Sequence, residues 1–407
     1  MRILILDQAA PTTIHSGKSV RLINILQRLQ PAHELRYLSI VGPRDAQTVP
    51  DWMQALVVSS QVWTRHEQEF RPGRYLNWIM LQPWCYAPWR YPSDFRTLRA
   101  QLERLVDEQE IDLIHCFDGE VAQFIPSRSR WIFDQGDAMS LHAVRRIRET
   151  RDPLRQLSWR LLARRMHRYE RQLIDRAGAS VFVSDVDARC YATNAVRRSK
   201  IHVIPNGVDA DYFQPNPPTR QPANPPMILL TGHMSFPPND HAARVLIDEI
   251  MPLVRRQMPG ARCAIVGADP AAALLARRAE HVMVTGRVED LRPYFNEAAV
   301  YACPMRMGAG IKNKLLEAMA MGCAIVTTPL AADGLRVQDG AQVRWADSPA
   351  QFAEAIAGLL RDAAQRERLG QAARRYVMEE HSWDHVGAAY AQLYQRVSAG
   401  KQQRCVA

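Results

Sequence analysis

The sequence predicts an α/β fold in which two parallel-sheet halves follow one another along the chain. Short apolar strands alternate with helical segments through both halves, which is the pattern of parallel sheets covered by helices. A Pro-rich run, Gln214–Pro226, lies between the halves and predicts a stiff, exposed linker. At 407 residues the chain is long enough for two domains of ordinary size.

The first half opens with a strand and a helix and continues with further short apolar strands. The expected elements, in order, are the strand Ile3–Leu6, the helix Val20–Leu29, and the strands Ile111–Cys116, Trp131–Phe133 and Ser180–Ser184. Ile201–Ile204 is a further strand, and the turn after it contains Asn206 and Gly207, which tolerate positive φ.

The second half repeats the alternation. Its expected strands are Ile228–Thr231, Cys263–Val266, Val282–Thr285, Val300–Cys303 and Ala324–Thr327, and its expected helices include Asp240–Val254 and Pro349–Arg361. Ser348 is a suitable N-cap for the latter helix, with Pro349 at its first position. Both halves are therefore Rossmann-like, and we expect domains at residues 1–212 and 213–380, with residues 381–407 as a separate C-terminal segment.

The most informative stretch is Pro304–Gly322, a Gly-rich turn between a strand and a helix. Gly308 and Gly310 let a ligand approach the backbone, and the N–H groups at the start of the helix favour an anion. Lys312 and Lys314 add positive charge, and Glu317 shares a helix face with Lys314 roughly 10 Å from the turn. Such a site suits a ligand with phosphates at one end and hydroxyl groups at the other, as in a nucleotide sugar. The alternative is that Glu317 is a solvated or salt-bridged helix residue that binds no ligand.

Two motifs carry a resemblance to family-4 retaining glycosyltransferases. Leu316–Gly322 (Leu-Glu-Ala-Met-Ala-Met-Gly) resembles the donor-site motif of that family, and Ile204–Asp209 is similar to its domain-joining motif. The resemblance implies the GT-B architecture, two Rossmann-like domains facing across a cleft, with the donor on the second domain and the acceptor on the first. It also implies a C-terminal helix that crosses back to the first domain. The family usually has a second Glu where this chain has Ala309, but some members have a Gly- and Lys-rich turn there instead, so we still expect Ala309 to lie in the donor site.

The resemblance also places weaker candidates for donor binding. It implies that Gly17 approaches the donor phosphate or sugar, and that His233 follows a strand where many members hold the pyrophosphate with Arg and Lys. Arg287 and Val288 occupy the place where the family packs the nucleobase against backbone. A turn glycine is the alternative for Gly17. A P-loop is disfavoured because Thr12 stands where that motif needs its first Gly.

Two aspartates are the candidate catalytic residues. Asp134 and Asp137 follow the strand Trp131–Phe133, and polar residues at the carboxyl ends of parallel strands line the ligand-binding edge. The resemblance implies that Asp134 and Asp137 lie near the anomeric carbon of the donor, where family members often have a His. The alternative is a turn stabilised by Asp side chains. Asp118 and Glu120 are a second possible pair.

Positive charge concentrates in the first half. Residues 1–200 carry 30 Lys and Arg against 22 Asp and Glu, which implies an anionic partner. Thr150–Ala177 is a basic amphipathic stretch, and Tyr75–Phe95 is rich in Trp and Tyr. Both segments fit an anionic membrane surface, or ordinary core packing with a solvated cationic side.

Together with these features, the resemblance implies a retaining glycosyltransferase that acts on a nucleotide diphosphate sugar, with a saccharide or lipid-linked acceptor. We expect surface polysaccharide or glycolipid synthesis, no nucleic acid partner and no required cofactor or metal. We expect a cytoplasmic protein, since no apolar run is long enough to span a bilayer, and the basic amphipathic and Trp- and Tyr-rich segments suggest peripheral association with the inner membrane face. The alternatives are a nucleotide-sugar epimerase of the same fold and a catalytically silent sugar- or nucleotide-binding protein.

Overall fold

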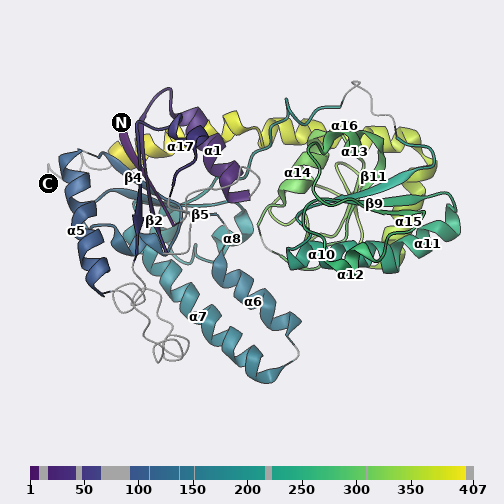
Figure 1. The fold of residues 1–407 in the computed structure, drawn as a ribbon, viewed down its shortest axis with the longest axis horizontal. Coiled ribbons are helices and arrows are strands. Elements are labelled where there is room, and N and C mark those ends of the chain that lie inside the picture. The colour runs from purple at the N-terminus through teal and green to yellow at the C-terminus, as the bar shows by residue number, and fades with distance from the viewer. Residues whose placement is uncertain are drawn as a thin grey trace. The chain divides into compact units, whose positions relative to one another are not determined.

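The computed structural model describes residues 1–8, 17–42, 48–65, 92–109, 111–136, 138–150, 152–215, 222–308 and 310–399. The chain divides into two compact units (Figure 1). Unit 1 comprises Met1–Pro205 with Val386–Ala407, and unit 2 comprises Asn206–His385. The division after Pro205 comes a few residues before the expected boundary at 212/213.

Unit 1 is built on a parallel sheet with the strand order β3-β2-β1-β4-β5-β6-β7. The strands are β1 Arg2–Asp7, β2 Glu34–Val41, β3 Ser59–Thr64, β4 Leu113–Cys116, β5 Trp131–Gly136, β6 Ala179–Phe182 and β7 Ile201–Val203. Every expected strand of this half is present. The sequence analysis missed β2 and β3, which carry the register Arg36↔Ser59 to Val41↔Thr64. The order reverses direction between β1 and β4, and such a switch point is where open α/β sheets bind ligands.

The helices of unit 1 connect these strands. They are α1 Gly17–Leu29, α2 Asp51–Gln54, α5 Pro92–Glu108, the 3-10 turn Val121–Phe124, α6 Met139–Glu149, α7 Pro153–Arg176, α8 Asp185–Arg189 and α9 Ala195–Lys200. Helices α6 and α7 pair as a hairpin that extends away from the sheet (Figure 1). The Trp- and Tyr-rich segment lies almost entirely outside the described residues, since residues 66–91 are not among them.

Unit 2 has a second parallel sheet, ordered β10-β9-β8-β11-β12-β13, with its own switch point between β8 and β11. Its strands are β8 Met227–Thr231, β9 Arg262–Val266, β10 Val282–Val284, β11 Ala298–Cys303, β12 Ile325–Thr327 and β13 Arg344–Trp345. All five expected strands form, and β13 is the one that the sequence analysis missed. The strands β8, β11 and β12 are buried along their whole length, which explains why each reads as a short continuous apolar run.

Helices cover both faces of the second sheet, with α14 and α16 on one side and α10 and α12 on the other (Figure 1). The helices of unit 2 are α10 Pro237–Arg244, the π-helix Val245–Ile250, α11 Met251–Gln257, α12 Ala272–Leu275, α13 Arg292–Glu297, α14 Asn313–Ala320, α15 Pro349–Arg361 and α16 Ala363–Glu380. Helix α15 has the expected bounds and a capping box formed by Ser348 and Gln351. Helix α17, Trp383–Ala399, begins in unit 2 and continues in unit 1.

Candidate functional site

Two glycines lie close together at the carboxyl edge of the second sheet, beside its switch point. Gly232 follows β8 and Gly267 follows β9, with φ of 152° and 148°. A Cβ atom at Gly267 would lie 1.9 Å from the carbonyl oxygen of Gly232, and one at Gly232 would lie 2.9 Å from Lys314 Nζ. Only glycine permits this close approach, which brings two strand ends and a lysine ammonium together.

Lys314 lies at the switch point and links three elements. Its ammonium donates a hydrogen bond to Asn239 Oδ1 on α10 and lies 3.8 Å from Met305 Sδ after β11. Asn239 in turn donates from Nδ2 to the carbonyl oxygen of His233, at 2.9 Å. Burial lowers the pKa of Lys314, against the opposing influence of Cys303 and Glu317. The site therefore holds a lysine whose charge is costly unless an anion compensates it.

Glu317 lies one turn after Lys314 on the half-buried face of α14, while Ile311, Leu315 and Met319 pack into the core as the sequence predicts. Burial raises the pKa of Glu317 to about 7, although Lys314 opposes the shift. Within the described residues, no protein group donates a hydrogen bond to this carboxylate. A half-buried carboxylate with a raised pKa and open oxygens is typical of a binding site rather than of a solvated helix face.

Lys312 does not occupy the same environment as Lys314. It is 8% exposed, and its ammonium donates to the carbonyl oxygen of Gly310 within the turn itself. A Cβ on Gly308 would lie 3.4 Å from Lys312 Cε, so the lysine stem packs against that glycine. Lys312 thus closes the Gly-rich turn, and its expected contact with a diphosphate stays a prediction. Ala309 lies outside the described residues.

His233 and Asp269 bring the loops after β8 and β9 together. His233 Nε2 lies 3.1 Å from Asp269 Oδ2, and its Nδ1 lies 2.8 Å from Ser235 Oγ. Asp269 has a φ of 54°, an uncommon conformation for a residue with a side chain, and such strain often marks a functional loop. The sequence analysis singled out His233 but missed Asp269 and Asn239, because only the fold brings them together.

Arg287 and Val288 lie beyond the end of β10 on the same edge. Arg287 is exposed, whereas Val288 is half-buried and packs against the core. Gly286, just before them, pairs with Gly267 in an isolated bridge. The structure thus brings five predicted residues to one sheet edge: His233 in the loop after β8, Arg287 and Val288 in the loop after β10, and Lys314 and Glu317 on α14, which follows β11 across the switch point.

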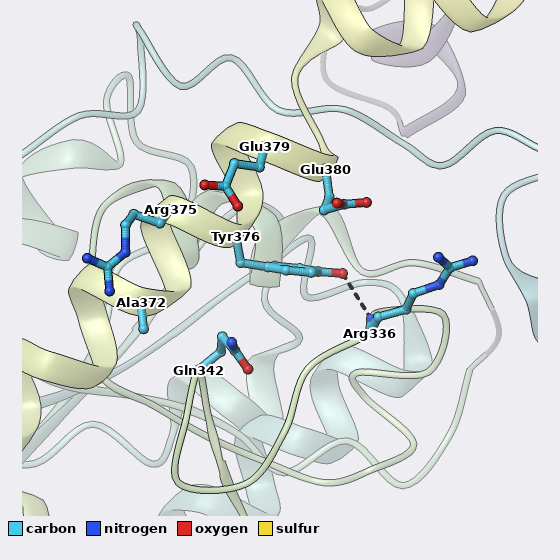
Figure 2. Close-up of a pocket in the computed structure, with 7 residues that line it drawn as sticks. All are labelled: Arg336, Gln342, Ala372, Arg375, Tyr376, Glu379 and Glu380. Atoms are coloured by element: carbon cyan, nitrogen blue, oxygen red, sulfur yellow. Dashed lines mark hydrogen bonds between the residues drawn. The ribbon is translucent and has the colours of Figure 1, made fainter.

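A pocket elsewhere in unit 2 contains none of these residues. Figure 2 shows it between α16 and residues 336–342, lined by Arg336, Gln342, Ala372, Arg375, Tyr376, Glu379 and Glu380. Tyr376 Oη accepts a hydrogen bond from the backbone N–H of Arg336 at 2.9 Å, which ties the loop to the helix. This pocket is open and its cations and carboxylates are mixed, so we do not place the donor site there.

In unit 1, Asp134 is inside the core. Only 2% of the residue is exposed, and its carboxylate accepts a hydrogen bond from Tyr390 Oη of α17. His115 Nε2 lies 3.3 Å from the same oxygen, and a guanidinium nitrogen of Arg21 lies 3.6 Å from it. Although burial disfavours its charge, Arg21, His115 and Tyr390 hold the pKa of Asp134 below its usual range. Action at a reacting bond stays a prediction for Asp134, and Asp137 lies outside the described residues.

The switch point of unit 1 carries a separate charged cluster. Lys18, the residue after Gly17 at the start of α1, bonds to Asp7 at the end of β1 and to Asp118 after β4. Glu120, on the same loop as Asp118, pairs with Arg65. Burial raises the pKa of Asp118 to about 6, although Lys18 opposes the shift. The side chains of Asp118 and Lys18 are 30% and 43% exposed, so the cluster reaches solvent at the edge where ligands bind.

Two negative observations apply to the described part of the chain. No three His, Cys, Asp or Glu side chains come together there as a metal-binding group. Likewise, none of the helices traced between residues 1 and 399 has the length and apolar character needed to cross a bilayer.

Both halves of the chain match known glycosyltransferase families. Residues 225–362 match the family described as Glycosyl transferases group 1, and residues 53–212 match Glycosyltransferase Family 4. A GDP-mannose-dependent alpha-(1-6)-phosphatidylinositol monomannoside mannosyltransferase of Mycobacterium tuberculosis is 25% identical over 336 residues, which cover 75% of this chain and 82% of the relative. A phosphatidyl-myo-inositol mannosyltransferase of the same species is 28% identical over 240 residues, covering 56% and 62% of the two chains.

Solved structures share the fold across nearly the whole chain. Sucrose-phosphate synthase from Thermosynechococcus elongatus superposes with a TM-score of 0.69 at 16% identity, covering 98% of this chain and all of the other. Anabaena HepE in complex with UDP superposes with a TM-score of 0.68 at 14% identity, covering 97% and 100%. Both sheets of this chain therefore belong to an architecture that recurs in enzymes and nucleotide-bound proteins.

Proposed function

The chain belongs to glycosyltransferase family 4 and has the GT-B fold, and we propose that it transfers a sugar from a nucleoside diphosphate sugar to an acceptor hydroxyl with retention of configuration. The bond from the anomeric carbon to the diphosphate oxygen breaks, and a bond from that carbon to the acceptor oxygen forms. The acceptor hydroxyl proton passes to the departing diphosphate, which leaves on the same face of the sugar.

The observation that carries this proposal is the Lys314–Glu317 pair at the β8/β11 switch point. The pKa of each residue is shifted by burial toward its neutral form. A ligand with a phosphate and a vicinal diol relieves both costs at once, because the phosphate compensates the ammonium and the diol donates to the carboxylate. The N–H groups at the start of α14 and the ammonium of Lys314 then stabilise the charge that develops on the leaving diphosphate. His233, held by Asp269, is a further donor on the same edge.

For the acceptor, we propose the charged cluster at the switch point of unit 1. Asp118 and Glu120 are carboxylates held in place by Lys18 and Arg65, and they are partly exposed. Carboxylates fixed in this way accept hydrogen bonds from the hydroxyl groups of a sugar or polyol. Gly17, at the start of α1 beside this cluster, keeps its predicted place near the substrates.

The mannosyltransferases named above act on phosphatidylinositol-based acceptors, so we propose a glycolipid or other lipid-linked saccharide as the acceptor of this chain. The proposal includes peripheral association with the inner, cytoplasmic face of a membrane, since a lipid-linked acceptor need not leave the bilayer. The basic character of unit 1 supports an anionic surface as its partner.

A donor panel tests the proposal. The purified chain is incubated with GDP-mannose, UDP-glucose and related nucleotide sugars, with and without a bacterial lipid extract, and nucleoside diphosphate release and labelled lipid are followed. We expect the release of nucleoside diphosphate to depend on the lipid extract. We also expect the new glycosidic bond to have the same anomeric configuration as the donor. Inversion at the anomeric carbon would contradict retention, and conversion of the donor sugar into an epimer without transfer would identify an epimerase.

A further inference from the structure

The α6–α7 hairpin concentrates exposed apolar side chains. Of the eleven large apolar residues that are exposed in the described chain, five lie on these two helices: Met139, Val144, Leu154, Leu157 and Leu161. Leu154 is 77% exposed, Leu157 53% and Leu161 46%. The sequence left open whether this stripe faces the core, and only the far end of α7 does so, through Tyr169, Leu173 and Ile174.

The three leucines continue into arginines along one stripe of α7. Leu154, Leu157, Leu161, Arg164 and Arg168 follow one another at alternating spacings of three and four residues, so they share one helix face. Arg164 and Arg168 are exposed. The stripe runs roughly 21 Å along the axis, with leucines at the end beside the α6–α7 turn and arginines toward the sheet.

The base of the hairpin is fixed to the body of unit 1. Glu170, 4% exposed, accepts a hydrogen bond from the backbone N–H of Ser140 on α6 at 3.3 Å and another from Tyr191 Oη. Ser140 Oγ and Tyr191 Oη lie 2.6 Å apart. At the other end, Asp152 caps α7 by accepting from the N–H of Leu154 at 2.9 Å. The leucine end is thus presented by a well-capped helix with a fixed base.

The charge around this stripe indicates which kind of partner it fits. Residues 139–176 contain eleven Arg and four Asp or Glu, so the hairpin carries a large positive charge around its apolar end. A protein groove that receives an amphipathic helix needs apolar anchors along the whole stripe, whereas here the anchors end at Leu161. An apolar end followed by cations along the same face matches the depth profile of an anionic lipid surface, where acyl chains lie beneath phosphates.

We propose that the α6–α7 hairpin docks unit 1 on an anionic bilayer, with Leu154, Leu157 and Leu161 at the boundary of the acyl chains and Arg164 and Arg168 against the lipid phosphates. The proposal rests on the lipid-linked acceptor proposed above and names the surface that would bring the enzyme to it. Binding then has two parts: salt screens the arginine part, and the leucine part withstands salt.

Vesicle flotation tests this with the full chain. Wild type is mixed with phosphatidylglycerol–phosphatidylcholine vesicles or with pure phosphatidylcholine, at low and high salt. We compare Leu157→Gln/Leu161→Gln and Arg164→Gln/Arg168→Gln with two control variants on α9, Val196→Gln and Arg198→Gln. Val196 is 66% exposed, so its replacement matches the leucine change outside the hairpin.

Wild type should float with anionic vesicles and hardly with neutral ones. Each hairpin variant should lower the partition constant for vesicle binding by about tenfold or more. The arginine pair should lose most of its effect at high salt, and the controls should bind like wild type. Failure of wild type to bind anionic vesicles at low salt, or equal losses in the controls, would overturn the proposal. A change of oligomeric state in the Leu157→Gln/Leu161→Gln variant would also overturn it, because the leucines would then form an interface between copies of the chain.

A second readout separates this proposal from the catalytic one. Thermal stabilisation by GDP or UDP in vesicle-free solution reports the donor site alone, and the hairpin variants should leave it unchanged. Vesicle binding without any nucleotide effect would leave the docking surface standing and reject the donor site. Nucleotide binding without vesicle binding would reject the docking surface only.

Discussion

Tyr390, in the C-terminal helix α17, donates a hydrogen bond to the carboxylate of Asp134 at the end of β5, 256 residues earlier in the chain. The same hydroxyl accepts from Arg21 at 2.5 Å, and Arg21 also donates to the carbonyl oxygens of Ile204 and Pro205, both at 3.0 Å. Arg21, on the first helix of unit 1, thus binds the last residues before unit 2, and Tyr390 joins both Arg21 and the buried Asp134 to α17.

Tyr390→Phe should destabilise the protein by about 1.5–3 kcal/mol, because it removes a hydrogen bond to a buried charged group. Tyr394→Phe is the matched control: its hydroxyl pairs with His115 Nδ1 at 2.6 Å, and burial lowers the pKa of that histidine, so the lost bond is between neutral groups. Urea unfolding followed by circular dichroism measures both. A larger loss of unfolding free energy in Tyr394→Phe than in Tyr390→Phe would contradict the stronger hydrogen bond expected at the Asp134 carboxylate.

The same cluster predicts how stability depends on pH. The pKa of Asp134 is depressed in the folded state, so its contribution is present above the unfolded value of about 3.9 and is lost as the pH falls through the folded value. Asp134→Asn should therefore be less stable than wild type at neutral pH, and the difference should shrink in acid. Melting curves between neutral pH and pH 3 check this. A constant difference across that range would show that folding does not depress the pKa of Asp134.

Glu317→Gln should stabilise the free protein and weaken the donor complex. The pKa of Glu317 is raised to about 7, above the unfolded value of about 4.3, so ionisation makes folding less favourable as the pH rises through that window. At pH 8 the variant should gain more than about 1 kcal/mol of stability, since each unit of pKa shift is worth about 1.4 kcal/mol. Calorimetry of the free protein and titration with nucleoside diphosphate measure the two effects.

The same shift predicts that wild type binds nucleotide less well at pH 6 than at pH 8, because only the ionised carboxylate accepts hydrogen bonds from both ribose hydroxyls. Glu317→Gln should show a flatter pH dependence of affinity. Unchanged nucleotide affinity in a folded variant would remove Glu317 from the donor site.

Lys314→Gln should weaken nucleoside diphosphate binding by at least about tenfold and leave nucleoside binding nearly unchanged, because its ammonium is placed for the phosphates. Lys312→Gln should instead lower stability, since the Lys312 ammonium bonds inside the turn. Isothermal titration with diphosphate and nucleoside, beside thermal unfolding, separates the two lysines. Equal loss of diphosphate binding in both variants without loss of stability would instead show that both lysines bind the diphosphate.

Asp118→Asn should raise the KM for the acceptor severalfold and leave the donor affinity unchanged, because this carboxylate lies in unit 1. Asp112→Asn is a suitable control, since it removes a carboxylate that pairs with Arg2 just before β4. Initial rates at varied acceptor and fixed donor give the KM. A change in donor affinity alone would place the Asp118 cluster outside the acceptor site.

Much of the fold could be predicted from the sequence because its local signals are strong. Continuous apolar runs predict the buried strands β8, β11 and β12, and Ser348 with Pro349 predicts the start of α15. The strands β2 and β3 were missed: Glu34–Val41 mixes polar and apolar residues, and Ser59–Thr64 is only half-buried. Periodicity is weak in such segments, and pairing with β1 decides their structure.

By itself, the sequence determined the Gly-rich turn, the helix that follows it and the face that presents Lys314 and Glu317, because glycine φ and helical spacing are local properties. Only the tertiary structure decided which polar residues meet. The fold turned Asp134 into a buried partner of Tyr390, joined His233 to Asp269, and gave Lys312 and Lys314 different hydrogen-bond partners. It also left Leu154, Leu157 and Leu161 exposed. An amphipathic pattern reports that a helix has an apolar face, but long-range packing determines whether anything covers that face.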